Sequence, residues 1–445
     1  MTTPALSLAS ICARPVDSAT LERAALHVQD WLGCAAAGAC EAVGAPLAAW
    51  AASRPPGPAT LLTGQRAGML DACLINGAFG NPLEMDDVHR AAILHPGPVV
   101  IPAALAVGEA TGASAGDVLA AIVRGYEAMI RVGVAAGPGH YAFWHPTATC
   151  GVFGAAMAAA SLMRLGTDAT IAALGNAGTQ AAGLWQVRHE DVMAKQLHTA
   201  HAAHAGVLAA DWAQHGFSGA RTILEGPQGF FAALGGGDPH KVSAGPDRPW
   251  KIFEVSFKPW PACRHAHPLI DAALALREEL SADALAAIDF VEVCTYADAI
   301  KFCDKPAPLS ALAAKFSLQH CAATVLLHGR PELAHFEPAA LAEARVAALR
   351  ARVRVATAEP YASAYPAHFG AALTVHTAGR RHEYAVNDAL GDPENPLSRD
   401  AIDAKARTLM QHARWKASRI DAAMQAIRNL PGAPTLAALT ATFHP

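Results

Sequence analysis

The feature that most constrains this chain is a change in its hydrophobic periodicity near residue 250. From residue 18 to about 240, apolar residues recur at helical spacing, as in Leu21, Ala25 and Val28, and Asp17 or Ser18 can cap that helix. Although 52% of the residues are hydrophobic, only 6% are aromatic, so helices must pack through small alanine and glycine side chains. The spacing predicts further helices over residues 101–111, 114–132, 148–165, 168–183 and 193–216.

Beyond residue 250 the pattern alternates, which is typical of strands. We expect strands at 287–296 and 352–357 and a hairpin over 372–386, with helices at 268–280, 308–328 and 338–351 between them. The segment 398–430 returns to helical spacing. The sequence therefore predicts a mainly α protein with a second, smaller α+β domain. Residues 1–265 and 395–445 are expected to form the large all-helical domain, and residues 266–394 the α+β domain.

Composition excludes several classes of protein. Lys and Arg number 34 against 38 Asp and Glu, giving a formal charge of -4, which argues against nucleic acid as a partner. Apolar runs end before the roughly 20 residues that a membrane span needs, and the N-terminus lacks the basic region of a signal peptide. Nine cysteines without a CxxC pair suit a reducing compartment, so we expect a cytoplasmic protein. Nucleotide-binding, zincin and serine-hydrolase motifs are missing from the sequence.

The segment 84–97 gathers carboxylates and histidines in a stretch that Pro and Gly keep out of regular helix. Asp86 and Asp87 can orient and tune His89 or His95, and such pairs perform general acid–base catalysis. The alternative is a solvated loop with a helix-capping aspartate. The segment is therefore a candidate source of catalytic groups.

Two later segments offer binding groups. His145 and Thr147 precede a Gly/Ala helix whose first amides can seat an anion, although Thr147 can equally be a simple helix cap. Lys195 and His198 begin a helix that also carries His201 and His204 at successive i, i+3 positions. This second group is open to three interpretations: a metal site, histidines packed in the core, or a metal-free cationic site.

The segment 258–268 contains Lys258, Arg264, His265 and His267, and three prolines stiffen it near the expected domain junction. Small-molecule sites concentrate between domains, and a cationic cluster in an acidic chain favours a carboxylate ligand. A structural linker with solvent-facing cations is the alternative. Farther on, His320 in the Lys315-Phe-Ser-Leu-Gln-His segment can add a contact to the ligand.

Together these segments resemble the MmgE/PrpD family, which includes 2-methylcitrate dehydratase, cis-aconitate decarboxylase and iminodisuccinate epimerase. The matching stretches occur in family order across nearly the whole chain, at 81–98 (NPLEMDDVHRAAILHPGP), 125–127, 144–156, 194–206 (AKQLHTAHAAHAG), 224–230, 257–272 (FKPWPACRHAHPLIDA) and 315–320. The resemblance implies a cofactor-free homodimer with a large helical domain, a smaller α+β domain and a substrate cleft between them. The family's site residues fall on Asp86, Asp87, His95, His145, Lys195, Lys258, His265 and His267.

The chain departs from the family pattern in two places. His320 stands where the FSLxY segment of family members often has tyrosine, and the loop of the dehydratases typically reads HPSD where this chain has His95-Pro-Gly-Pro. We expect Asp86, Asp87, His95, His145, Lys195 and His267 to be catalytic. We expect the substrate-binding residues to be His89, Thr147, His198, Lys258, Arg264, His265 and His320.

The leading functional hypothesis is a metal-independent and cofactor-independent lyase that dehydrates a 2-methylcitrate-like carboxylate in the cytoplasm. The family's reactions pass through carbanion-like species beside a carboxylate, so cations that stabilise the developing charge are required. An isomerase resembling iminodisuccinate epimerase, a cis-aconitate decarboxylase-like enzyme and a catalytically silent polycarboxylate-binding protein are the alternatives.

Overall fold

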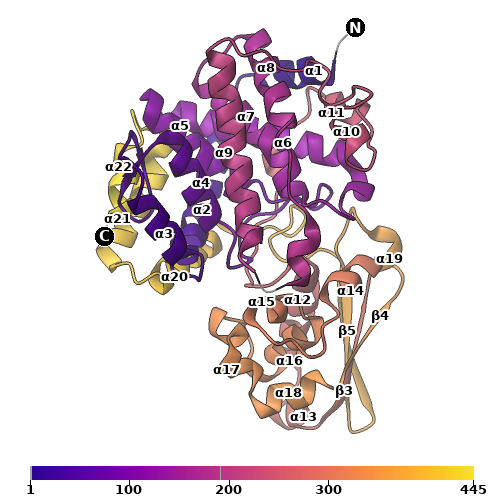
Figure 1. Ribbon diagram of the computed structural model, residues 1–445. Helices are drawn as coiled ribbons and strands as arrows, with labels where there is room; N and C mark the ends of the chain where they lie inside the picture. Colours follow the sequence, from indigo (N-terminus) through magenta and orange to yellow (C-terminus); the bar gives the residue numbers. More distant parts are fainter. Residues whose placement is uncertain (1–2, 191, 445) are drawn as a thin grey trace. The chain divides into compact units, whose positions relative to one another are not determined.

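The computed structural model describes residues 3–190 and 192–444 and divides into two compact units (Figure 1). The helical unit contains the residues up to Pro82, Asp86–Val255 and the residues from Ser398 onward, and the α+β unit contains Leu83–Met85 and Ser256–Leu397. The predicted fold class, mainly α with a smaller α+β domain, is therefore confirmed.

The unit boundaries lie at Val255 and Ser398, whereas the sequence suggested residues 265 and 395. Residues after Val255 belong to the α+β unit because they make long-range hydrogen bonds to it, and the spacing of apolar residues in the sequence does not predict such bonds. The backbone amide of Phe257 donates to the carbonyl of Gly391 at 3.0 Å, and the Ser256 hydroxyl donates to Asp392 at 2.6 Å.

The helical unit is built mainly from long helices, and the C-terminal segment returns to pack against its N-terminal part. Asp17 caps the second helix as expected, accepting a hydrogen bond from the Thr20 amide. The helices are α1 (Pro4–Cys12), α2 (Ser18–Gly38), α3 (Gly44–Ala52), α4 (Met69–Phe79), α5 (Gly97–Thr111), α6 (Ala115–His140, kinked at Gly137), α7 (Pro146–Leu162), α8 (Thr167–Gly178), α9 (Ala194–Gln214), α10 (Phe230–Ala233), α11 (His240–Ser243), α20 (Arg399–His412), α21 (Ala417–Asn429) and α22 (Ala437–Thr440). A short ladder pairs β1 (Ala59–Thr60) with β2 (Arg66–Ala67).

Small residues allow the central helices of this unit to approach closely. A Cβ added to Gly206 on α9 would lie 2.5 Å from the Cβ of Ala155 and 2.6 Å from the carbonyl oxygen of Val152, both on α7. A Cβ on Gly154 would meet Met129 of α6 at 2.7 Å. The alanine- and glycine-rich composition therefore sets helix spacing, which in turn fixes the start of α7 and the first turn of α9.

The α+β unit has a four-stranded sheet in the order β4-β3-β5-β6. Its strands are β3 (Ile288–Thr295), β4 (Val353–Thr357), β5 (Ala371–Thr377) and β6 (Arg380–Val386); β3 pairs parallel with β4 and antiparallel with β5. Val291, Val293, Leu373 and Val375 pack into one core with the helices of this unit. The helices are α12 (His267–Glu279), α13 (Ala282–Ala286), α14 (Ala297–Cys303), α15 (Ala311–Lys315), α16 (Leu318–His328), α17 (Pro338–Leu341), α18 (Ala344–Arg350) and α19 (Tyr361–Ala364).

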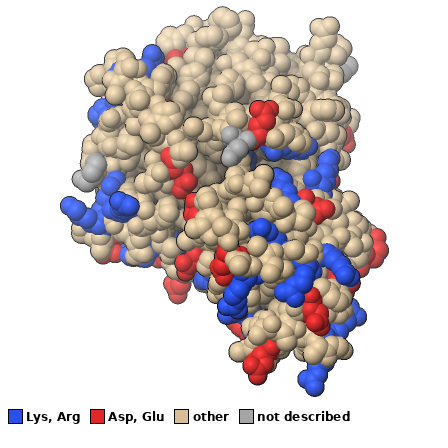
Figure 2. Space-filling view, turned by 60° about the horizontal axis from the view of Figure 1, so that its bottom comes forward, with Lys and Arg blue, Asp and Glu red and all other residues tan. Residues whose placement is uncertain are grey.

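The surface agrees with the charge balance of the sequence. On the face drawn in Figure 2, Lys and Arg side chains lie among Asp and Glu side chains, mostly in the lower part of the picture, and neither sign of charge forms a continuous patch. Among the described residues no helix has both the length and the apolar character needed to cross a membrane.

Candidate active site

A histidine–aspartate pair lies in the loop that joins α4 to α5. Nδ1 of His95 is 2.8 Å from Oδ2 of Asp86, and the side-chain amide of Asn81 donates to both oxygens of that carboxylate at 2.7 Å. Asp86 is 1% exposed, whereas the His95 side chain is 14% exposed. A buried, oriented carboxylate behind a more accessible imidazole is the arrangement that general acid–base catalysis uses.

Asp87, the next residue, holds the same loop through contacts with Tyr126, Gly97 and His27. Its carboxylate accepts hydrogen bonds from the Tyr126 hydroxyl at 2.6 Å and from the Gly97 amide at 2.8 Å, and it pairs with Nδ1 of His27 at 2.7 Å. A Cβ on Gly97 would lie 2.7 Å from Oδ1 of Asp87, so only glycine permits this contact. Asp87 therefore holds the start of α5, immediately after His95.

A second pair of imidazoles lies at the start of α7 and the first turn of α9. Nδ1 of His145 is 3.0 Å from Nδ1 of His198, and the ring of Trp185 lies against His145 with centroids 4.2 Å apart. The centroids of His95 and His145 are 6.4 Å apart, and the backbone amide of His95 donates to the Thr147 hydroxyl at 3.1 Å. The structure thus brings together His95, His145 and His198.

Burial and positive charge keep the second pair of imidazoles neutral. Desolvation lowers the pKa of His145 well below its usual value, and His198 and Lys195 lower it further. Desolvation and Lys195 lower the pKa of His198 to about 4. At neutral pH neither His145 nor His198 therefore carries a positive charge, and Lys195 stands beside them in the first turn of α9.

Other histidines expected near the site make different contacts. Nε2 of His89 lies 3.2 Å from Oε2 of Glu254, and burial lowers the pKa of His89. Nε2 of His201 lies 3.1 Å from the carbonyl oxygen of Gln180. Within the described part of the chain, neither His198 nor His201 belongs to a group of three side chains whose ligand atoms lie close enough together to hold a metal ion.

In the α+β unit, the expected carboxylate-binding cations lie beside carboxylates of the protein itself. Nζ of the fully buried Lys258 is 3.8 Å from Oε2 of Glu84. The guanidinium of Arg264 donates to the carboxylate of Asp392 and, at 3.1 Å, to the carbonyl of Leu390. The binding of substrate by Lys258 and Arg264 stays a prediction, and each of these side chains already lies beside a carboxylate of the protein.

The neighbouring histidines are equally engaged. Arg264 also contacts Nδ1 of His267 at 3.0 Å, and Nε2 of His267 lies 3.1 Å from the carbonyl oxygen of Ala262. Since that carbonyl accepts the Nε2 proton, Nδ1 is left as the acceptor for the guanidinium. His267 is fully buried with both ring nitrogens occupied, so its catalytic role also stays a prediction.

His265 lies in an aromatic box of the α+β unit. Its ring stacks between Phe302 and Phe369, with interplanar angles of 5° and 7°, and its Nδ1 is 2.7 Å from the Tyr296 hydroxyl. Desolvation lowers the pKa of His265 to about 4. The box therefore holds a neutral imidazole.

His320 occupies a separate place in the α+β unit. Its amide donates to the Ser317 hydroxyl at 3.0 Å, its Nε2 lies 2.9 Å from the carbonyl oxygen of His335, and its ring packs against Phe336. None of these described contacts involves another candidate site residue. A role for His320 in binding stays a prediction.

Several supporting residues were missed by the sequence reasoning. His27, Asn81 and Tyr126 hold the two aspartates, and Trp185 covers His145. His27 lies 60 positions from Asp87 in the sequence, so no local spacing connects them. Tyr126 falls in a stretch matching the family, which was the one available signal for it.

The chain belongs to the MmgE/PrpD family. Residues 6–243 match the MmgE/PrpD N-terminal domain, and residues 260–429 match the MmgE/PrpD C-terminal domain. The chain is 29% identical to a cis-aconitate decarboxylase of Aspergillus terreus over 345 residues, covering 72% of this chain and 70% of that protein. It is also 29% identical to a cis-aconitate decarboxylase-like protein of Aspergillus oryzae over 301 residues, and it spans only 62% of that relative's length. Human cis-aconitate decarboxylase is 27% identical over 300 residues, covering 64% of this chain and 60% of the human protein.

Proposed function

We propose that this protein is a lyase that acts on a small di- or tricarboxylate, with His95 transferring a proton at a carbon next to a carboxylate group. The observation that carries the proposal is the 2.8 Å pair between His95 and Asp86, which Asn81 holds in place. The Asp86 carboxylate lies beside Nδ1 of His95, so its negative charge favours the tautomer with the proton on Nδ1. Nε2 is then the nitrogen that exchanges a proton with the substrate.

Negative charge that develops on the substrate needs a fixed cation. Lys195 lies close enough to His145 and His198 to lower the pKa of each, and those imidazoles are neutral at neutral pH. We assign Lys195 to bind a substrate carboxylate and to stabilise a carbanion-like species. Lys258 of the α+β unit is assigned to a second carboxylate group, on the basis of the family resemblance.

Decarboxylation is the reaction favoured by the relatives, which are cis-aconitate decarboxylases. In that reaction a carbon–carbon bond breaks, carbon dioxide leaves, and the electron pair left on carbon takes a proton from His95. Solvent then reprotonates the histidine. Dehydration of a 2-methylcitrate-like substrate is the alternative: a base removes the proton next to the carboxylate, and hydroxide leaves with a proton from an acid.

The test is proton NMR in D2O with the full-length enzyme and a panel of citrates, aconitates, and imino- or hydroxy-dicarboxylates. A decarboxylase releases carbon dioxide and gives a product with one deuterium at the protonated carbon. A dehydratase gives an enoate from a citrate, and an epimerase exchanges and inverts without losing any group. An enzyme that binds these acids but leaves every one unchanged and unexchanged would overturn the proposal. The expected homodimer, cytoplasmic location and independence of metals and cofactors stay predictions.

A further inference from the structure

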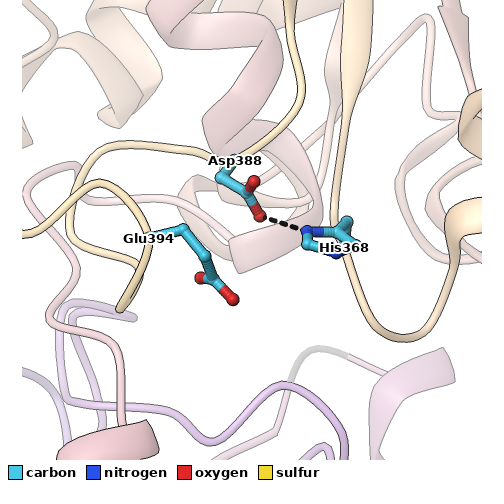
Figure 3. A group of neighbouring side chains, drawn as sticks. All are labelled: His368, Asp388 and Glu394. Carbon is cyan, nitrogen blue, oxygen red and sulfur yellow. Dashed lines mark hydrogen bonds and ion pairs between the residues drawn. The ribbon is translucent and has the colours of Figure 1, made fainter.

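Three side chains with metal-binding atoms converge in the α+β unit, and none of them is assigned to the reaction. His368 lies between α19 and β5, and Asp388 and Glu394 lie in the turn that follows β6 (Figure 3). Nδ1 of His368 is 2.7 Å from Oδ1 of Asp388, and one ligand atom from each of the three residues lies within 4.8 Å of the others. Of the residues that the structure describes, these form the one such group.

The turn that carries both carboxylates has a fixed backbone. Asp392 at its centre is fully buried and accepts a hydrogen bond from the Ala389 amide at 3.1 Å, and its own carbonyl accepts from the Asn395 amide at 3.0 Å. The Asn395 side chain donates to the carbonyl of Asp388 at 3.2 Å. These bonds hold Asp388 and Glu394 in place from both ends of the turn, as a preorganised site requires.

The segment with the histidine is anchored independently. The His368 amide donates to the carbonyl of Ala364 at 3.0 Å, and the adjacent Phe369 is 2% exposed. Phe369 packs against Tyr296 and Tyr365, with ring centroids 5.3 and 5.2 Å away. The imidazole therefore starts from a rigid position beside the turn.

The donor set selects a class of ion. One imidazole nitrogen and two carboxylate oxygens suit zinc, manganese or cobalt, whereas calcium and magnesium prefer oxygen ligands alone. Bonds of about 2.1 Å place neighbouring ligands about 3–3.5 Å apart, so separations up to 4.8 Å close by small side-chain rotations. Glu394 is exposed, which leaves a path from solvent. We propose that His368, Asp388 and Glu394 bind a divalent transition-metal ion.

An ion at this site would stabilise the turn that contacts Arg264. The same turn receives the guanidinium of Arg264 on Asp392 and on the carbonyl of Leu390. A ligand that binds only the folded state raises its stability, so occupancy should raise the melting temperature of the protein. The proposal concerns a site apart from the acid–base residues and does not depend on the proposed reaction.

The chain supplies a matched control. His376 pairs with Glu292 at 2.7 Å, just as His368 pairs with Asp388, and both histidines are partly exposed. The described residues include no third ligand that completes the His376 pair. His376→Ala thus removes an equivalent histidine–carboxylate contact without touching the proposed site.

The experiment uses full-length, tag-free protein stripped with a chelator and titrated with Zn²⁺ by calorimetry and with Co²⁺ by visible absorption. We expect one ion per chain, a Co²⁺ absorption band that Zn²⁺ removes, and a higher melting temperature with the ion. His368→Ala and Glu394→Gln should each weaken binding more than about tenfold, whereas His376→Ala should bind as the wild type does. Melting temperatures in chelator show whether each variant is folded.

Three results would overturn the proposal. The first is the absence of saturable binding by the wild-type protein. The second is equal weakening by His376→Ala and His368→Ala. The third is unchanged stoichiometry in a His368→Ala/Glu394→Gln protein, because the ion would then bind elsewhere.

Discussion

In the helical unit, the carboxylates of the candidate site face groups that share or donate protons: Asp86 meets His95 and Asn81, and Asp87 meets His27 and Tyr126. In the α+β unit, Glu84 lies against Lys258 and Asp392 against Arg264. An imidazole is a group that can take part in acid–base catalysis, whereas a guanidinium stays charged and can only hold its partner carboxylate in place. We therefore expect proton transfer to occur in the helical unit, and we expect Arg264 and Asp392 to stabilise the α+β unit.

The largest expected effect comes from breaking the His95–Asp86 pair. His95→Gln should lower kcat by about 10²–10⁴-fold, because it removes a general acid–base group. The melting temperature should change little, since the histidine is partly exposed. Steady-state kinetics and thermal unfolding measure the two quantities. His412→Gln, in an exposed pair with Glu41 of the same unit, is the control and should leave both unchanged.

The counterpart in the α+β unit is Arg264→Ala. It should lower the free energy of unfolding by about 3–5 kcal/mol, because Asp392 would remain buried without its cation. Urea denaturation measures the loss. Arg381→Ala removes an exposed partner of Glu383 and should cost less than about 1 kcal/mol. Equal losses from the two changes would mean that the buried pair has no special structural role.

Acid should weaken each unit through a buried histidine. Burial lowers the pKa of both His27 and His265 to about 4, so the folded state favours their neutral forms. The contribution of each neutral histidine to the free energy of unfolding is fully present above pH 6.5 and is lost as the pH falls toward 4. This loss is at most about 3 kcal/mol for each histidine. His265→Phe should therefore lose less unfolding free energy than the wild type between pH 6.5 and 4, measured by urea denaturation. An identical loss in both proteins would contradict the assignment.

The smallest expected effect separates the two roles of Lys258. Lys258→Met should lower kcat/KM about tenfold to a hundredfold if the ammonium binds a substrate carboxylate, a contact worth roughly 1.5–3 kcal/mol. The same change leaves Glu84 buried without its cation, so stability should fall as well. Lys258→Met/Glu84→Gln should recover stability but not activity. Recovery of activity in the double variant would make Lys258 purely structural.

Periodicity predicted most of the elements because helical spacing and alternation reflect which face of each element is buried. The strand expected at 287–296 is β3 (Ile288–Thr295), and the expected hairpin turns at Ala378-Gly379 between β5 and β6. The expected helix over 308–328 is instead two helices, because the Ser317 side chain caps α16. The two-residue strands β1 and β2 are too short to leave a pattern.

Residue spacing could predict which candidate site residues lie together only where those residues are close in sequence. Asp86 and His95 share one loop, so their association follows from local chain geometry. The pairing of Arg264 with Asp392 spans 128 positions, and no local pattern distinguishes such a cation from one that waits for a ligand. Burial and long-range packing decide that difference, and they emerge only in the folded chain.

The most direct test of the account is the rate of deuterium incorporation from D2O into the product formed by Asp86→Asn, compared with the wild type and with His412→Gln. Asparagine keeps the size of Asp86 but lacks the negative charge that lies beside Nδ1 of His95. We expect a loss of about 10²-fold or more in Asp86→Asn with the fold unchanged, and none in His412→Gln. Incorporation at the wild-type rate in folded Asp86→Asn would contradict the claim that this pair transfers the proton.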